Sequence, residues 1–404
     1  MSGIRFFHVA DLHLDSPFKG VYGLSERAQK ELRNSTFQAF EKIIHHALEV
    51  KPDFMLFVGD LYDGENRSLK AQRRFQEGME KLFSANIPVI VSHGNHDHLN
   101  GQWTRFSLPS NVIVLPKETT VVQLTIRGQI VNVYGFSYPE RHVKEPMIHT
   151  FPVAEDSSIL HIGMLHGSVA GDASHAVYAP FTKEELLSKG YDYWALGHIH
   201  ARQHLHDNPP IVYPGNIQSR HRNEQGVKGF YDVHLTKGHA ELEFVPTSAV
   251  VYDTVEVNCT GFMHANELLA ACTEAIATCR EKHGAIVVDV KLISEDDLSL
   301  ELIQSALVED WLEAIRESES AQQPFTWVQG LTVDTQVGKD YVPTAVTESV
   351  LDVLEKWGQN EWKNVLKDLY QHASGSRFLE PLTVQEIEQL KAGAEQLFKN
   401  EMAR

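Results

Sequence analysis

Short apolar runs separated by polar turns recur through the first 250 residues of the chain. The runs are rich in β-branched and aromatic residues, and each is followed directly by Gly, Asp or His. Runs of this kind are typical of buried strands that end in turns. We therefore predict strands at Ile4–Ala10, Phe54–Val58, Ile87–Ser92, Ile159–Leu165 and Tyr191–Leu196.

In two of the segments between these runs, the apolar residues have the spacing of an amphipathic helix. Residues 25–50 and 68–85 repeat apolar positions every three or four residues, and Phe37, Phe40 and Ile43 belong to one apolar stripe. Alternating segments predict additional hairpin-like strands at Asn111–Leu115, Val121–Ile126, Ile130–Phe136, Phe230–Leu235 and Ala240–Val245. These strands are too many for a simple doubly wound sheet. They favour an α/β fold with two sheets packed face to face and helices outside.

The pattern of elements changes after about residue 250. A small α+β domain is predicted from alternating strands and helices at 251–257, 265–282, 285–292, 298–317 and 325–333. Helices are predicted for the rest, at 345–357, at 361–370 and after the capping box Thr383-Val384-Gln385-Glu386. We therefore expect three parts, 1–250, 251–340 and 341–404. The apolar stripe of the last helix packs on its own domain or docks a partner, and the sequence leaves both readings open.

Charge and histidine content differ between the two sides of residue 250. Residues 1–250 carry 24 Lys and Arg against 27 Asp and Glu, whereas residues 251–404 carry 12 against 27. The first part also holds 19 of the 22 histidines. This asymmetry suggests a catalytic domain in residues 1–250 joined to an acidic part with a different function. We expect that the acidic part does not bind DNA by itself.

Cysteine usage and hydropathy exclude several classes of protein. Cys259, Cys272 and Cys279 form no C-x-x-C pair, so we expect small buried side chains and neither a disulfide framework nor a thiolate metal site. No stretch approaches the roughly eighteen apolar residues of a membrane span. The first residues, with Arg5 and an early Asp11, do not resemble a secretory signal, so a cytoplasmic protein is expected.

Five polar motifs follow the predicted strands, where the loops of α/β proteins converge. A single motif of this kind is weak evidence for a functional site, because an Asp after a strand usually belongs to a turn or caps a helix, and a lone His is usually a core or surface residue. Five in succession predict a functional site. They are Asp11-Leu12-His13, Gly59-Asp60, Gly94-Asn95-His96-Asp97, His166-Gly167 and Gly197-His198-Ile199-His200.

Carboxylate, amide and imidazole donors without thiolate suit divalent ions such as Mn²⁺, Mg²⁺, Fe²⁺ or Zn²⁺. A carboxylate can bridge two cations, and Asp60 after a glycine has room for both, so we predict that Asp60 is the bridging ligand. On an extended strand His198 and His200 would point the same way. Two ions roughly 3.5 to 4 Å apart can clamp a phosphate ester and stabilise its displacement.

Adjacent side chains diverge in the motif that contains Asn95. Asn95 is therefore predicted to ligate a metal while His96 faces the substrate as general acid or transition-state stabiliser. Asp97 is predicted to orient the His96 imidazole and to favour its charged form. Gly94 would permit the close approach of the backbone.

These motifs resemble those of the calcineurin-like metallophosphoesterase superfamily, which read D-x-H, G-D, G-N-H-D/E, a strand-end His and G-H-x-H. The resemblance implies a four-layer αββα sandwich followed by a capping domain. It also implies two sets of ligands that share Asp60. These are Asp11, His13, Asp60 and His200 for one ion, and Asp60, Asn95, His166 and His198 for the other.

Within the superfamily, residues 9–14, 58–63 and 213–216 resemble the bacterial SbcD-type DNA-repair exonucleases, especially the YhaO-like subgroup. That resemblance implies manganese-dependent exonuclease or endonuclease cleavage of DNA together with an SbcC-like coiled-coil ABC-type ATPase. A homodimer is left open. Archaeal and eukaryotic members carry a second catalytic His where this chain has Asp63, so the role of Asp63 is left open as well.

Basic residues near the motifs are candidates for DNA contacts, although such clusters are as often solvated surfaces. They are Arg67, Lys70, Arg73 and Arg74 after the Asp60 motif, and Arg220, His221 and Arg222 after residues 213–216. Two competing functions remain. One is a phosphoesterase for small molecules, and the other is a mainly structural subunit of an ATPase–nuclease complex.

Overall fold

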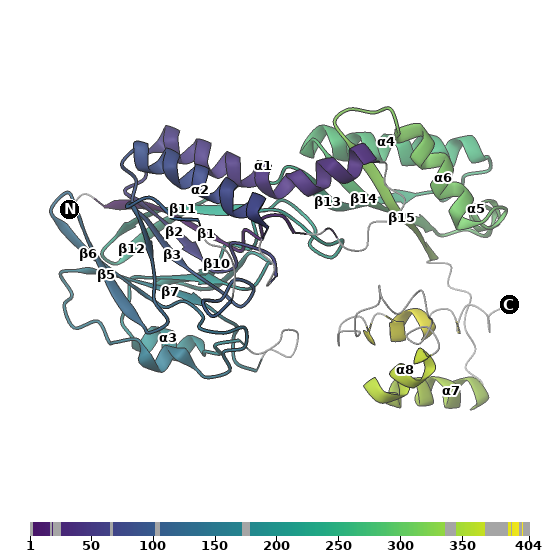
Figure 1. Ribbon diagram of the computed structural model, residues 1–404. Helices are drawn as coiled ribbons and strands as arrows, with labels where there is room; N and C mark the ends of the chain where they lie inside the picture. Colours follow the sequence, from purple (N-terminus) through teal and green to yellow (C-terminus); the bar gives the residue numbers. More distant parts are fainter. Residues whose placement is uncertain are drawn as a thin grey trace. The chain divides into compact units, whose positions relative to one another are not determined.

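The computed structural model describes residues 3–16, 18, 26–64, 68–101, 106–171, 178–335, 345–367, 387–388, 390–395 and 398. The chain divides into two compact units, Met1–Asp334 and Thr335–Arg404 (Figure 1). Arg67 and the predicted capping box at 383–386 lie outside the described residues. The expected boundary at residue 250 falls inside the first unit and stays a prediction.

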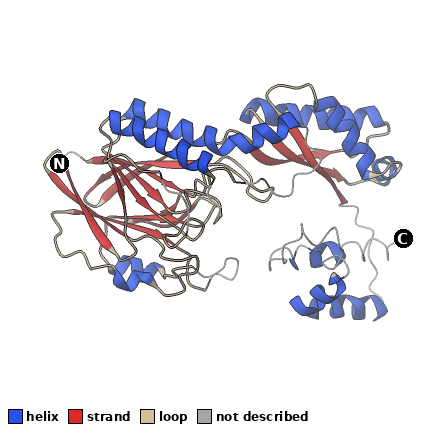
Figure 2. Ribbon diagram, in the orientation of Figure 1, coloured by secondary structure: helices blue, strands red, loops and turns tan. Residues whose placement is uncertain are grey.

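Two six-stranded mixed sheets form the larger part of the first unit (Figure 2). The first has the order β12 (His239–Pro246), β11 (Gly229–Thr236), β1 (Ile4–Ala10), β2 (Phe54–Val58), β3 (Val89–Ser92) and β4 (Val112–Val114). The second has the order β5 (Thr120–Ile126), β6 (Gln129–Gly135), β7 (Leu160–His166), β8 (Tyr193–Gly197), β10 (Pro210–Tyr213) and β9 (Gln203–Asp207). The pairs β1–β2, β2–β3, β6–β7 and β7–β8 are parallel, so their carboxyl ends share one edge of each sheet.

The core follows from the period of two along each strand. Phe6 of β1 points between the sheets and packs edge to face against Tyr193 of β8, whereas its neighbour Phe7 points to the outer face. On that outer face α1 (Glu26–Val50) and α2 (Leu69–Ser84) cover the first sheet. The short helices α3 (Lys183–Ser188) and η1 (Met147–Thr150) cover the outer face of the second sheet. The four-layer αββα sandwich is therefore confirmed.

A third sheet completes the first unit, with the order β13 (Val251–Asn258), β14 (Ile286–Ser294) and β15 (Thr326–Thr335). It packs with α4 (Ala265–His283), α5 (Asp297–Gln304) and α6 (Val308–Glu319) around a core that buries all three cysteines. The single helix predicted at 298–317 is wrong, because the chain breaks at Ser305–Leu307. There the Asp310 carboxylate accepts a hydrogen bond from the Leu307 N–H and starts a new helix.

The second unit contains α7 (Ala345–Lys356) and α8 (Gln359–Val365). At their junction the rings of Trp357 and Trp362 pack edge to face, with 5.4 Å between the ring centroids. Among the residues that the structure describes, no helix combines the length and the apolar character needed to cross a bilayer.

Candidate metal centre

Site residues predicted from the sequence lie in the loops after β1, β2, β3 and β8 and at the last residue of β7. Four of them, Asp11, His13, Asp60 and His198, have positive φ angles of 51°, 42°, 49° and 99°. Side-chain-bearing residues rarely adopt this conformation, and it concentrates at functional sites, where the surrounding structure holds it in place. The structure also corrects the prediction that His198 and His200 alternate on an extended strand, because β8 ends at Gly197 and the chain turns at His198.

Two glycines make the close packing of these loops feasible. A Cβ atom on Gly59, which has φ of 75°, would lie 2.2 Å from the His166 Nδ1 atom. A Cβ atom on Gly94 would lie 2.4 Å from the Asp60 Oδ1 atom. Larger residues at these positions would push His166 and Asp60 out of place, so the glycines are part of the architecture of the site.

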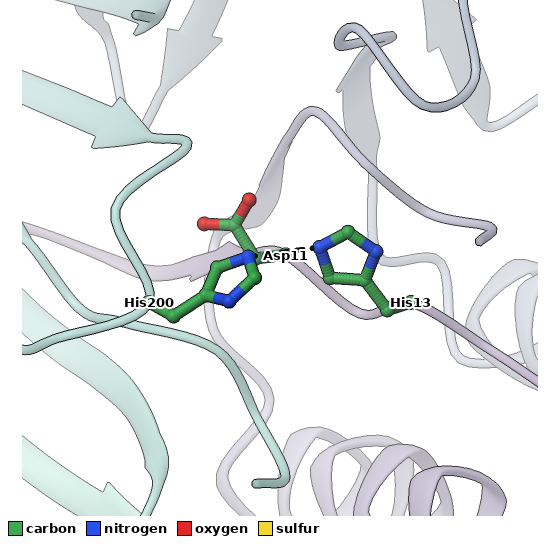
Figure 3. Close-up of side chains that lie close together, drawn as sticks. All are labelled: Asp11, His13 and His200. Atoms are coloured by element: carbon green, nitrogen blue, oxygen red, sulfur yellow. Dashed lines mark hydrogen bonds between the residues drawn. The ribbon is translucent and has the colours of Figure 1, made fainter. Parts of the chain in front are cut away.

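One group of candidate ligands consists of Asp11, His13 and His200 (Figure 3). The Nε2 atoms of His13 and His200 face each other at 3.0 Å. The Asp11 carboxylate accepts hydrogen bonds from the His198 N–H at 3.1 and 3.0 Å, which fixes its orientation. Burial lowers the pKa of His13 to about 3, so its imidazole is neutral at pH 7 and can act as a ligand.

A second group surrounds the side-chain oxygen of Asn95. Asn95 Oδ1 lies 3.1 Å from His166 Nε2 and 3.2 Å from His198 Nδ1. These three residues come from the loop after β3, the end of β7 and the loop after β8. The fold therefore brings together residues that are up to 103 positions apart in the sequence.

Asp60 lies between the two groups. Its Oδ2 atom is 3.7 Å from His13 Nε2 and 3.4 Å from His166 Nε2. Its Oδ1 atom accepts a hydrogen bond of 2.9 Å from the His96 N–H. A carboxylate in this position can contact a cation in either group.

The pKa values of the buried carboxyl groups of Asp11 and Asp60 are shifted in opposite directions. Burial raises the pKa of Asp11 to about 6. Burial also opposes ionisation of Asp60, but the adjacent His166, together with His96 and His13, outweighs it and holds the pKa of Asp60 well below its ordinary value. Since an isolated buried carboxylate is costly, this pair requires positive charge nearby, from His166 or from cations.

Glu224 contacts the site although it belongs to none of the five sequence motifs. Its Oε1 atom lies 2.6 Å from His200 Nδ1, and its Oε2 atom accepts hydrogen bonds from Asn216 Nδ2 at 2.9 Å and from the Arg220 N–H at 2.7 Å. Although burial opposes ionisation, the hydrogen bond with His200 holds the pKa of Glu224 below its ordinary value. A histidine ligand usually has such a carboxylate behind it, but no spacing in the sequence identifies which acid it is.

The carboxylate beside His96 is Asp63 and not Asp97, which corrects the prediction. His96 Nδ1 lies 3.4 Å from Asp63 Oδ1. Asp97 is fully buried; its carboxylate lies 2.9 Å from His93 Nδ1 and accepts hydrogen bonds from the Leu61 and Gly94 N–H groups. Asp97 therefore holds the loops after β2 and β3 together, because its short side chain points inward from the turn.

The predicted DNA-contacting residues lie in three different environments. Arg220 is inside the site, with its Nη1 atom 3.0 Å from Asp63 Oδ1. Arg74 is on the exposed face of α2, 3.3 Å from Glu41, and Arg222 lies 3.3 Å from Asp289 of β14. Lys70 lies over the Phe37 ring, and Arg73 pairs with Glu77.

Two family models match the chain. Residues 4–202 match the calcineurin-like phosphoesterase family, and residues 252–336 match the middle domain of the metallophosphoesterase YhaO. The chain is 34% identical over 407 residues to the uncharacterized metallophosphoesterase YhaO of Bacillus subtilis, and the match covers 100% of this chain and 98% of that relative.

More distant relatives were also found. The DNA double-strand break repair protein Mre11 of Methanocaldococcus jannaschii is 25% identical over 65% of this chain and 69% of its own length. Its counterpart in Aeropyrum pernix is 30% identical over 52% of this chain and 53% of its own length. Among solved structures, a dimetal phosphatase from Danio rerio matches 61% of this chain and 98% of its own, with 12% identity and a TM-score of 0.38.

Proposed function

The chain belongs to the calcineurin-like phosphoesterase family, and from this premise we propose that it is a dinuclear metal-dependent nuclease that hydrolyses phosphodiester bonds in DNA. The observation that carries the proposal is the convergence of seven nitrogen- and oxygen-bearing side chains, with Asp60 between the two groups. They are Asp11, His13, Asp60, Asn95, His166, His198 and His200.

The donor set fits a pair of divalent ions. Carboxylate, amide and imidazole donors without thiolate suit Mn²⁺ and related ions, and donors bound to one such ion lie about 3 Å apart. The distance of 3.0 Å between the His13 and His200 Nε2 atoms agrees with this spacing. In our proposal Asp11, His13, Asp60 and His200 hold one ion, while Asp60, Asn95, His166 and His198 hold the other.

When bound, the ions would activate water and neutralise charge on the phosphate. The chain supplies the remaining functions. In the proposal His96, whose side chain is 30% exposed, donates a proton to the leaving oxygen. Asp63 faces the Nδ1 atom of that ring, so the Nε2 atom on the other side of the ring would serve the leaving oxygen.

DNA as the substrate is supported by the Mre11 relatives, which are named for DNA double-strand break repair. Arg73, Arg74 and Arg222 are ion-paired with acidic residues of the same chain, so they offer limited charge to phosphates. We therefore include in the proposal an ABC-type ATPase partner that contributes further contacts with DNA.

The test compares two substrates with purified protein and Mn²⁺. The proposal predicts hydrolysis of both linear duplex DNA and bis-p-nitrophenyl phosphate, and loss of both activities in Asp60→Ala. Hydrolysis of the small ester alone, even with open DNA ends, would replace the nuclease by a phosphoesterase for small molecules. No hydrolysis of either substrate would remove the proposed activity.

A further inference from the structure

Glu224 lies in the irregular segment between β10 and β11, 24 positions after His200 in the sequence. Its side chain is 16% exposed, and its Oε1 atom is 2.6 Å from His200 Nδ1. On the other side of the ring, His200 Nε2 lies 3.0 Å from His13 Nε2. The imidazole of His200 is therefore held between a carboxylate and the candidate metal centre.

This contact determines which nitrogen of His200 carries a proton. A carboxylate accepts hydrogen bonds and cannot donate one, so the Nδ1 atom of His200 must carry its hydrogen toward Glu224. The Nε2 atom is then left with its lone pair directed toward His13 and Asp11. That tautomer is the one in which His200 can bind a cation through Nε2.

The second oxygen of Glu224 is occupied as well. Oε2 accepts hydrogen bonds from the side-chain amide of Asn216 and from the backbone N–H of Arg220. Glu224 thus faces donors through both oxygens. A glutamine at this position could accept hydrogen bonds only through its one carbonyl oxygen. Its NH₂ group would face a donor, either His200 Nδ1–H or the N–H groups of Asn216 and Arg220.

We propose that Glu224 is a positioning residue that fixes the tautomer and direction of His200 and thereby sets the affinity of one of the two ions. The inference rests on the proposed dinuclear centre but concerns a residue outside its ligand set. Partners of this kind typically change metal affinity about 10- to 100-fold when they are removed.

The segment that carries Glu224 is anchored to the third sheet on its far side. Arg222 pairs with Asp289 of β14 at 3.3 Å, and Gln225 Nε2 donates to Thr254 Oγ1 of β13 at 2.7 Å. The Gly226 N–H also donates to the Tyr252 carbonyl at 2.8 Å. Because these anchors flank Glu224, the third sheet takes part in holding His200 in position.

The experiment measures the binding of Mn²⁺ to the full chain by titration against a competing chelator, with the number of ions bound per chain as the second readout. The variants are Glu224→Gln and Arg222→Ala. Glu241→Gln is the matched control, because Glu241 also lies beside a histidine, His239 at 3.4 Å, but on the exposed strand β12. Circular dichroism and thermal unfolding establish that each variant is folded.

We expect Glu224→Gln to weaken one ion about 10- to 100-fold and to leave the other unchanged, with hydrolysis restored by excess Mn²⁺. Arg222→Ala should weaken the same ion by a smaller factor, and Glu241→Gln should bind both ions as the wild type does. Wild-type affinity for both ions in folded Glu224→Gln would overturn the inference while the proposed function stood. Equal weakening of both ions would overturn it too, since the effect would then not act through His200. If the wild type binds no ion, the proposed function fails first.

Discussion

The Oδ1 atom of Asp63 lies 3.4 Å from the Nδ1 atom of His96. Asp63 is itself fixed, because Ser16 Oγ donates a hydrogen bond to its Oδ2 atom and Arg220 pairs with Oδ1 at 3.0 Å. Although burial opposes ionisation, His13 and Arg220 hold the pKa of Asp63 below its ordinary value, so it remains a carboxylate. The role of Asp63 is open from the sequence, and this geometry favours that of a positioning residue for His96 and for His13, whose Nδ1 atom also lies 3.4 Å from Asp63 Oδ1.

Replacing His96 by Ala should remove most hydrolysis and leave both ions bound. The expected loss in kcat is about two to four orders of magnitude, the usual contribution of an acid–base catalyst. Elemental analysis of the dialysed protein and steady-state kinetics with duplex DNA check the two halves of this prediction. Loss of an ion from His96→Ala would mean that His96 is a ligand.

Asp63→Asn should reduce hydrolysis in a way that depends on the leaving group. A p-nitrophenolate leaves without a proton, whereas the alkoxide leaving group of DNA requires one. We therefore expect a larger relative loss of kcat with DNA than with bis-p-nitrophenyl phosphate. Asp207→Asn is a matched control, since Asp207 lies 3.8 Å from His204 on the exposed strand β9. An equal loss with both substrates would argue against a role for Asp63 at the leaving group.

The strands that carry the site could be predicted because they are buried and therefore nearly continuous in apolar residues. Ile4–Ala10 and Phe54–Val58 have the same bounds in the prediction and in the structure. Glu224 could not be predicted, because its place beside His200 depends on an irregular segment whose path is set by tertiary contacts. The turn at His198 could not be predicted either, because a positive φ is uncommon at any residue other than glycine and nothing in the sequence marks where it occurs.

Asp60→Ala should lose both ions, whereas substitution of a ligand in a single group should lose one. The reason is the position of Asp60 Oδ2, within 3.7 Å of His13 Nε2 and 3.4 Å of His166 Nε2. The number of Mn²⁺ ions bound per chain is measured for Asp60→Ala and for His200→Ala. Retention of one ion by Asp60→Ala would show that Asp60 does not bridge.

Gly59→Ala should disrupt the site far more than Gly128→Ala does. Both glycines have positive φ, so each substitution carries a similar backbone strain of about 1 kcal/mol. The added methyl group at residue 59 would also collide with His166, whereas no atom of the described residues lies within 4 Å of the corresponding point at Gly128. Metal content and thermal stability of the two variants separate these effects. Similar metal content in both variants would refute the steric explanation.

The stability of the fold should fall with acid pH in part because of His8. This side chain is fully buried in β1, with its Nδ1 atom 3.0 Å from Tyr193 Oη and its Nε2 atom 3.0 Å from the Leu196 carbonyl. Burial lowers its pKa to about 3 in the folded chain, against 6.5 for an ordinary histidine. Below pH 6.5 the unfolded chain therefore takes up a proton that the folded chain does not, and the free energy of unfolding falls by about 1.4 kcal/mol per pH unit.

His8→Gln separates this contribution from all others, because glutamine keeps a neutral polar side chain but cannot take up a proton. Urea unfolding of the wild type and the variant is compared at pH 7 and pH 5, so that titrations common to both cancel. The free energy of unfolding of the wild type should decrease relative to that of His8→Gln by about 2 kcal/mol between these pH values. If the difference in free energy of unfolding between the wild type and His8→Gln stays constant with pH, then His8 takes up a proton in the folded chain as readily as in the unfolded chain. Its burial would then be compensated by a charge that the contacts with Tyr193 and Leu196 do not supply.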